Sequence, residues 1–87
     1  MRVTVISPER AMFDGDAEAV VVPAFDGFVG ILPHHAPLLT LLGAGTLTVR
    51  HEGAHTAFEV DGGFLQVVGD SVRVVVDRTR GAPTAQA

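Results

Sequence analysis

Apolar and polar residues alternate with a period of two along most of this 87-residue chain. Val72, Val74 and Val76 share one face of such a run, opposite Arg73. This alternation is the pattern of a strand that turns one face to a core and the other to water. The alternating runs are residues 2–6, 46–50, 58–60 and 71–77. No window of about 12 residues carries the apolar stripe of an amphipathic helix, so the chain is predicted to be all-β.

Turn signals separate these runs. Glycine, often beside an acidic residue, favours a tight hairpin because glycine and Asp accept a positive φ. The signals are Asp14-Gly15, Asp26-Gly27, Gly43-Ala44-Gly45, Glu52-Gly53, Asp61-Gly62-Gly63 and Gly69-Asp70. About eight short strands at this spacing predict a β-sandwich or a barrel. Residues 37–42 fit either a strand or a single helical turn, and the small polar residues 79–87 predict a flexible C-terminal tail.

Length, charge and composition exclude several classes of protein. A chain of 87 residues forms one domain, here over residues 1–78, and is too small for a large enclosed active site. Cysteine is absent, so neither a disulfide nor a cysteine-ligated zinc stabilises it. The net charge of −4, with no lysine, argues against binding to nucleic acid or anionic lipid. Without an apolar run of about 18 residues or a signal-peptide layout, we expect a soluble intracellular domain with no direct membrane insertion.

No catalytic or metal site is indicated. His34 and His35 would point to opposite faces of an extended segment, and His51 and His55 could face each other across a turn with Glu52 to form only a weak site. Neither serine lies in a nucleophile elbow, and no glycine-rich segment continues into the lysine of a phosphate-binding loop. We therefore expect no catalytic residue, no metal, no cofactor and no small-molecule substrate.

The segment 29–39 is both apolar and rich in proline. Pro33 and Pro37 fix φ and lack an amide donor, so the segment is predicted to form a rigid edge or corner of the fold. We call residues 29–39 the proline-braced shelf. Two interpretations stay open: the shelf is a docking surface for another protein, or its side chains complete a thin core.

The shelf also carries a resemblance to a known family. Residues 30–38 read Gly-Ile-Leu-Pro-His-His-Ala-Pro-Leu, which resembles the Gly-Ile-Leu-Pro-x-His-x-Pro-Leu signature of the epsilon subunit of F-type ATP synthases. Segments 7–15, 61–67 and 72–77 resemble further strands and turns of the same family, in the same order. The resemblance extends over about residues 1–78.

The resemblance implies a flattened sandwich of two antiparallel sheets with about ten short strands. It also implies a noncatalytic rotor subunit of the central stalk, which links the gamma subunit to the c-ring and couples ion translocation to ATP synthesis. By position, the gamma-binding candidates are Ser7, His35, Pro37 and Leu38, and the c-ring-binding candidates are Asp26, Gly27 and Phe28. The implied location is the cytoplasmic face of the bacterial inner membrane, where the subunit would be a peripheral part of the complex.

Two departures from the family pattern change these expectations. An acidic residue usually stands at the position of Phe28, so the contact with the c-ring is expected to be more apolar here. The chain also ends where family members continue into a two-helix hairpin, so we expect coupling without inhibition by that hairpin and without nucleotide binding. A free-standing β-sandwich adaptor for another protein and a small metal-dependent enzyme that uses the histidines remain as rival hypotheses.

Overall fold

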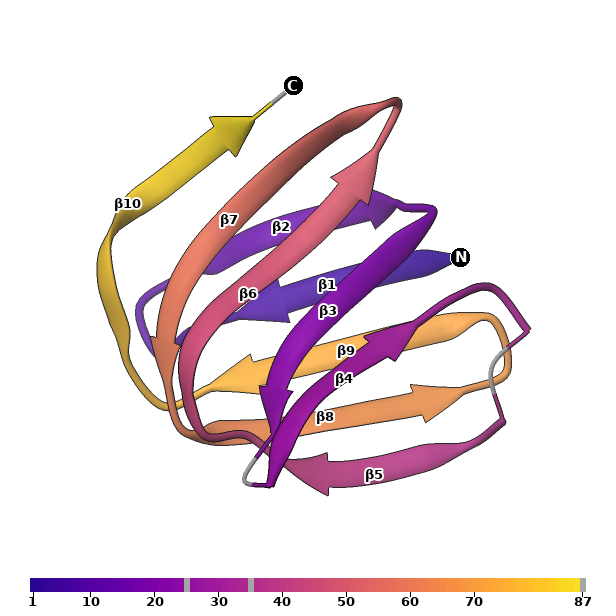
Figure 1. Ribbon diagram of the computed structural model, residues 1–87, viewed down its shortest axis with the longest axis horizontal. Helices are drawn as coiled ribbons and strands as arrows, with labels where there is room; N and C mark the ends of the chain where they lie inside the picture. Colours follow the sequence, from indigo (N-terminus) through magenta and orange to yellow (C-terminus); the bar gives the residue numbers. More distant parts are fainter. Residues whose placement is uncertain (25, 35, 87) are drawn as a thin grey trace.

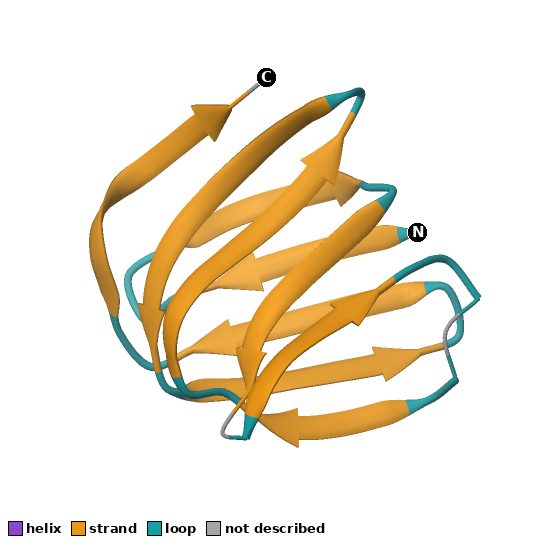
Figure 2. Cartoon of the chain, in the orientation of Figure 1, coloured by secondary structure: helices purple, strands orange, loops and turns teal. Residues whose placement is uncertain are grey.

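The computed structural model describes residues 1–24, 26–34 and 36–86, and the side chains as far as residue 78. Ten strands form two five-stranded sheets that pack face to face (Figure 1), and the described residues contain no helix (Figure 2). The strands are β1 (Arg2–Ile6), β2 (Ala11–Asp16), β3 (Ala19–Ala24), β4 (Gly27–Ile31), β5 (Leu38–Leu41), β6 (Ala44–His51), β7 (Ala54–Asp61), β8 (Gly63–Val68), β9 (Ser71–Val76) and β10 (Thr79–Gln86). The predicted all-β sandwich is confirmed.

The strand order places β4 and β5 at edges of different sheets. The first sheet has the order β2-β1-β9-β8-β5, and the second has the order β10-β7-β6-β3-β4. All neighbouring strands are antiparallel except β1 and β9, which are parallel. Figure 1 shows β4 and β5 on the same side of the sandwich, where the chain crosses from one sheet to the other.

The core consists of the inward-facing half of each alternating strand. Valine dominates it, because a β-branched side chain suits the pleated surface and loses little rotamer freedom there. The two inner faces interdigitate as in other sandwiches. The large side chains that are fully buried are Ile31, Leu47, Leu65, Val3, Val5, Val20, Val22, Val49, Val60, Val67, Val74 and Val76.

Gly62 and Gly63 take the chain from β7 in the second sheet to β8 in the first. Gly63 has a φ of 123°, and a Cβ atom at this position would lie 2.0 Å from the carbonyl oxygen of Val75 in β9. No side chain fits against that carbonyl. The Asp61-Gly62-Gly63 signal therefore marks a corner of the sandwich where two backbones approach closely.

The turn between β6 and β7 corrects one expectation about the histidines. Its two central residues, Glu52 and Gly53, have positive φ values of 52° and 77°, and His51 pairs with Ala54. His55 pairs instead with Arg50. Because the pleat alternates, this register places the two histidines on opposite faces of the hairpin. They do not face each other, since the turn is one residue shorter than the sequence suggests.

Two segments near the predicted boundaries prove to be strands. Residues 38–41 form β5, which resolves the choice between a strand and a helical turn. Residues 79–86 form β10, which pairs with β7 in two short stretches separated by an irregularity between Arg80 and Thr84. The sequence predicts a tail there because alternation stops after Asp77. The open edge of β7, however, accepts hydrogen bonds from any backbone, whatever its side chains. The flexibility of this segment stays a prediction.

Candidate functional site

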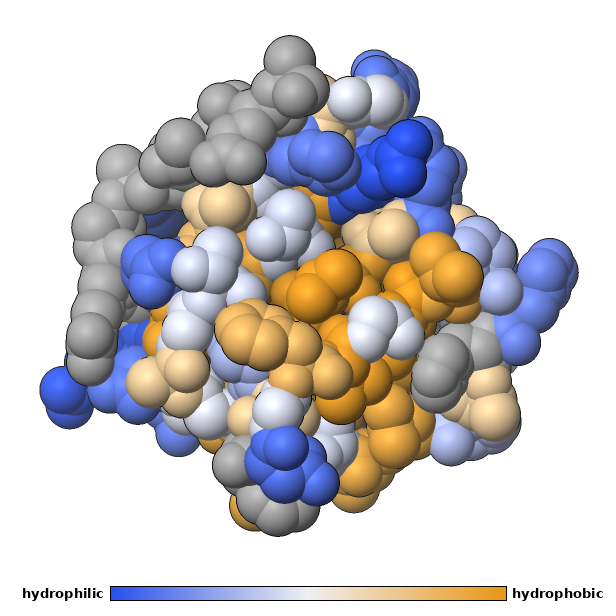
Figure 3. Space-filling model, viewed as in Figure 1, coloured by the Kyte–Doolittle hydropathy of each residue, from blue (hydrophilic) through white to orange (hydrophobic). Residues whose placement is uncertain are grey.

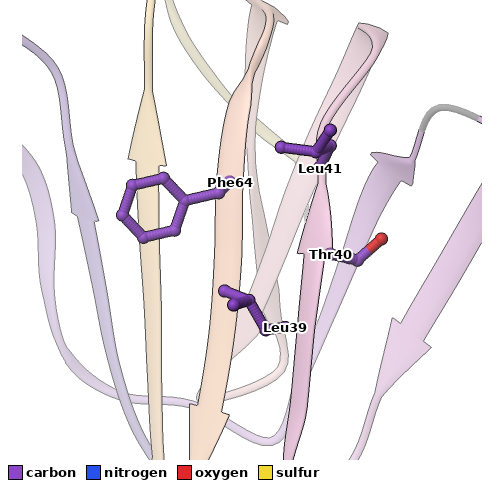
Figure 4. A pocket seen from close by; sticks show the side chains of 4 residues that line it. All are labelled: Leu39, Thr40, Leu41 and Phe64. Atoms are coloured by element: carbon purple, nitrogen blue, oxygen red, sulfur yellow. The ribbon is translucent and has the colours of Figure 1, made fainter.

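Four apolar side chains lie on the outer face of the first sheet. Leu39 and Leu41 of β5 are 70% and 64% exposed, and Phe64 and Val68 of β8 are exposed beside them. Figure 4 shows Leu39, Leu41 and Phe64 on one side of the sheet, with Thr40 pointing to the other side. An open hollow of about 560 Å³ is lined by Leu39, Leu41, Phe64 and Thr40. We call its three apolar residues, Leu39, Leu41 and Phe64, the outer apolar patch.

Leucine doublets place this patch on the outside of the sandwich. In Leu38-Leu39 and Leu41-Leu42, alternation sends one leucine of each doublet inward and the other outward. Leu38 packs against the core and Leu42 is buried within it, so their neighbours Leu39 and Leu41 must face away from it. A strand that is apolar on both faces normally needs cover on both faces.

The pairing register extends the patch across the sheet. In the pairing register, Leu41 of β5 is opposite Phe64 of β8, Phe64 is opposite Val75 of β9, and Val75 is opposite Ile6 of β1. One apolar row therefore crosses four strands. Val75 and Ile6 are half-buried. The result is a continuous apolar band on a face that no described part of the chain covers.

Polar residues bound this band towards the other end of the same face. The Arg2 guanidinium lies 2.7 Å from the Asp14 carboxylate, with both side chains more than half exposed. Arg73 and Gln66 are exposed in the intervening row. The outer face of the first sheet is therefore apolar at one end and charged at the other.

A second exposed apolar surface belongs to the hairpin between β3 and β4. Phe28 is 66% exposed, and Val21 and Leu32 are also exposed. Figure 3, which looks onto β3 and β4, shows hydrophobic side chains gathered over these strands. Pro23 and Phe28 lie over Gly45 of β6, where a Cβ atom would be 3.0 Å from the Pro23 ring and 3.7 Å from the Phe28 ring.

The three predicted c-ring-binding residues lie together in the hairpin that joins β3 to β4. Asp26, Gly27 and Phe28 are all exposed at the tip of the β3–β4 hairpin. Ala24, just before the tip, forms a bridge with Leu42, just after β5. The hairpin tip therefore adjoins the end of β5 that carries Leu41.

The four predicted gamma-binding residues do not form one cluster. Pro37 is exposed and Leu38 is half-buried at the start of β5, while His35 lies outside the described residues. Ser7 follows the far end of β1, with β9 and β8 between that strand and β5. From strand spacing and rise, Ser7 and Leu38 are roughly 20 Å apart. The structure gives no shared contact between them, and their role in binding stays a prediction.

Ser7 organises the turn from β1 to β2. Its hydroxyl donates to the Arg10 carbonyl at 3.1 Å and accepts from the Arg10 amide at 3.3 Å, and its own amide donates to the same carbonyl at 2.9 Å. Ser7 is the one buried polar residue among the described side chains. The hydrogen bonds within this turn account for the burial of the Ser7 hydroxyl.

Replacing Ser7 by alanine is expected to lower the free energy of unfolding by about 1 kcal/mol, because two hydrogen bonds of a buried hydroxyl are lost. Urea unfolding followed by circular dichroism measures this change. Ser71→Ala is the matched control, since Ser71 is exposed and its substitution should leave stability within about 0.5 kcal/mol. Equal stability of the two variants would contradict the structural role of the Ser7 hydroxyl.

The described side chains of the proline-braced shelf are partly buried in the core and partly exposed, which bears on the two interpretations left open by the sequence. Ile31 is fully buried and Val29 packs against the core, so these residues complete the interior. Leu32 and Leu39 are largely exposed, so they are available to a partner. The core interpretation is confirmed for Val29 and Ile31, and docking of a partner on Leu32 and Leu39 stays a prediction.

The described histidines His34 and His51 have separate surroundings. The His51 ring makes an edge contact with Phe13, with ring centroids 5.1 Å apart, and its Nε2 lies 3.2 Å from the Thr56 hydroxyl. His34 is exposed with a φ of 66°. Among the side chains that the structure describes, no three His, Cys, Asp or Glu residues gather where they could hold a metal ion.

Within the described part of the chain, no helix has the length and hydropathy needed to cross a bilayer. The fold itself defines the class: a ten-stranded β-sandwich with an exposed apolar patch on the outer face of one sheet.

The family follows from sequence comparison. A model of the ATP synthase Delta/Epsilon chain beta-sandwich domain matches residues 1–82. The chain belongs to this family of ATP synthase subunits, as the resemblance implies.

Two curated relatives illustrate the match. The ATP synthase epsilon chain of Leptospira interrogans is 39% identical over 77 residues, which cover 88% of this chain and 61% of the relative. The epsilon chain of Solibacter usitatus is 47% identical over 77 residues, which cover 88% of this chain and 58% of the relative. The chain thus spans about 60% of the length of these relatives.

Two solved structures share the fold. A chain from the central stalk/c-ring structure of the Tetrahymena thermophila mitochondrial ATP synthase superposes with a TM-score of 0.77 at 19% identity, over 92% of this chain and 65% of its own length. A chain from the Euglena gracilis mitochondrial ATP synthase, in a structure with OSCP, F1 and the c-ring, gives a TM-score of 0.82 at 21% identity, over 90% and 51%.

Proposed function

We propose that this protein is a noncatalytic subunit of the central stalk of an F-type ATP synthase, where it joins the gamma subunit to the c-ring and couples ion translocation to ATP synthesis. Family membership supports a place in the ATP synthase. The observation that carries the proposal is the outer apolar patch, whose leucines are too exposed for a domain that acts alone. As part of the complex, the subunit is peripheral to the bacterial inner membrane, on its cytoplasmic face.

The outer apolar patch is the surface we assign to gamma. A stable subunit interface needs an apolar centre with a polar rim. Leu39, Leu41 and Phe64 provide such a centre, Arg73 lies at its margin, and the Arg2–Asp14 ion pair lies further along the same face. Pro37 and Leu38, the gamma-binding candidates from the sequence, adjoin the patch at the start of β5.

The hairpin tip, with Asp26, Gly27 and Phe28, is the part we assign to the c-ring. The two surfaces are connected by backbone rather than by side chains. The Gly43 amide donates to the Pro23 carbonyl at 2.7 Å, and Ala24 bridges to Leu42. Because these contacts join the base of the hairpin to the end of β5 in a close-packed corner, we expect a force applied at the hairpin tip to pass to β5.

Affinity capture of the tagged chain from detergent-solubilised membranes of its own organism tests the proposal. We expect gamma and the c-ring to be recovered together in stoichiometric amounts. Recovery of neither, from membranes whose ATP synthase stays assembled, would contradict the proposal and favour the free-standing adaptor. A stoichiometric metal in the purified chain would instead support the metal-enzyme hypothesis.

Phe28→Ala is expected to weaken binding of the c-ring about tenfold while leaving gamma binding within twofold, because it removes most of an exposed aromatic side chain from the hairpin tip. Surface plasmon resonance with immobilised c-ring measures this effect. Raising the salt concentration should change c-ring affinity little, since an apolar contact is not screened. Strong salt dependence with an unchanged Phe28→Ala affinity would show that Asp26 makes the contact instead.

A further inference from the structure

The β5 edge is the least protected strand edge whose side chains are described. Proteins usually guard edge strands by keeping them short or with charges, proline or a bulge. Strand β2 has a register shift opposite Ile6 and carries Asp14 and Asp16. Strand β4 contains Gly27 and Gly30, and glycine weakens a strand. Strand β5 is short, at four residues, and follows Pro37, but it contains no charge, proline or bulge, and its register with β8 is unbroken from Leu38 to Leu41.

The hydrogen-bonding phase of β5 shows which backbone groups are free. In an antiparallel pair, successive residues direct their amide and carbonyl groups alternately towards and away from the neighbouring strand. The Leu42 amide donates to Gly63 on the β8 side, so Thr40 faces β8 as well and Leu39 faces the open edge. No described residue pairs with the Leu39 amide and carbonyl at that edge.

We infer that this edge is completed by β-strand addition: an extended, apolar segment of the gamma subunit pairs with β5 through the Leu39 backbone and becomes a sixth strand of the first sheet. This inference rests on the proposed function and specifies how gamma binds. Added strands gain affinity from main-chain hydrogen bonds and specificity from alternate side chains. Here the outward side chains of the added strand would lie beside Leu39 and Leu41, where apolar residues pair best.

A second copy of this chain is a poorer occupant for two reasons. Two β5 edges joined by a two-fold axis would leave both outer apolar patches exposed on the same side of the joined sheet. A four-residue edge also covers far less than the roughly 1,200–2,000 Å² that a stable interface buries. Gamma can instead cover the outer apolar patch and the adjoining edge together, because the two surfaces share Leu39.

Leu39→Pro compared with Leu39→Ala tests the inference. Both variants lose the leucine side chain, but only proline removes the amide that faces the open edge. Proline is tolerated at such an edge position because that amide is not part of the sheet. Isothermal titration with purified gamma is expected to show that Leu39→Pro binds about tenfold more weakly than Leu39→Ala, since one backbone hydrogen bond is lost and its partner is left unpaired.

Amide hydrogen exchange of the unsubstituted chain provides a second readout that does not depend on a variant that folds. The Leu39 amide should exchange fast in the free chain and slowly when gamma is bound, while the Thr40 amide is slow in both states. Equal affinities of the two variants, or a Leu39 amide that stays fast in the complex, would overturn strand addition even if gamma binds. Failure of the unsubstituted chain to bind gamma would overturn the proposed function itself.

Discussion

Gly63→Ala is expected to lower the free energy of unfolding by about 4 kcal/mol, because a methyl group at this position would overlap the backbone of the neighbouring strand. The added Cβ would lie 2.0 Å from the Val75 carbonyl oxygen and 2.8 Å from the Val76 Cα atom. The φ of 123° is also strained for any residue with a side chain. A domain of this size is stabilised by only about 4–13 kcal/mol, so the variant should be largely unfolded or melt far below the parent chain.

Thermal and urea unfolding followed by circular dichroism measure this effect, with Gly30→Ala as the matched control. Gly30 lies in β4 without a positive φ, and a Cβ atom there would meet nothing within 4 Å. Gly30→Ala should stay within about 0.5 kcal/mol of the parent. If Gly63→Ala were as stable as Gly30→Ala, the close approach of β8 and β9 described above would be wrong.

Leu41→Asp is expected to weaken binding to gamma roughly 30-fold or more, with little effect on folding. Leu41 is 64% exposed and lies in the middle of the outer apolar patch, beside Phe64. In the free chain the carboxylate stays hydrated. In the complex it would be buried without a partner, which is far more costly than losing the leucine contacts alone.

Ser71→Asp supplies the control for added charge. Ser71 is exposed on the same sheet, outside the outer apolar patch, in the row that contains Arg2. Its substitution should change gamma affinity less than threefold. Equal losses from Leu41→Asp and Ser71→Asp would mean that gamma responds to net charge rather than to the patch.

Most of the fold could be predicted because its strands are short, alternating and bounded by glycine turns. The valines at 72, 74 and 76 predict the inner face of β9, and Asp26-Gly27 predicts the β3–β4 hairpin. The parallel pairing of β1 with β9 could not be predicted in this way, because it joins segments nearly 70 residues apart in sequence and no local pattern specifies it. Strand β10 was missed since its pairing depends on the open edge of β7 and not on its own residues.

The candidate site was predictable only where it lies within one turn. Asp26, Gly27 and Phe28 share a hairpin tip, so their proximity follows from the sequence. Leu41 and Phe64 were not among the candidates, because the pairing of β5 with β8 brings them together. The sequence nevertheless contains a signal for this patch. The leucine doublets and the run 64–68 are apolar on both faces of a strand, and only one face of each strand can turn to the core of a two-layer sandwich.

The central claim is that this subunit transmits rotation between the c-ring and gamma. The most direct measurement is ATP synthesis by vesicles that contain ATP synthase depleted of this subunit, with and without the purified chain, under an imposed ion gradient. The account predicts that the parent chain restores synthesis, that Ser71→Asp restores it equally well, and that Leu41→Asp does so only at much higher concentration. Synthesis at the same rate without the chain, or no restoration when the bound chain saturates gamma, would contradict the claim.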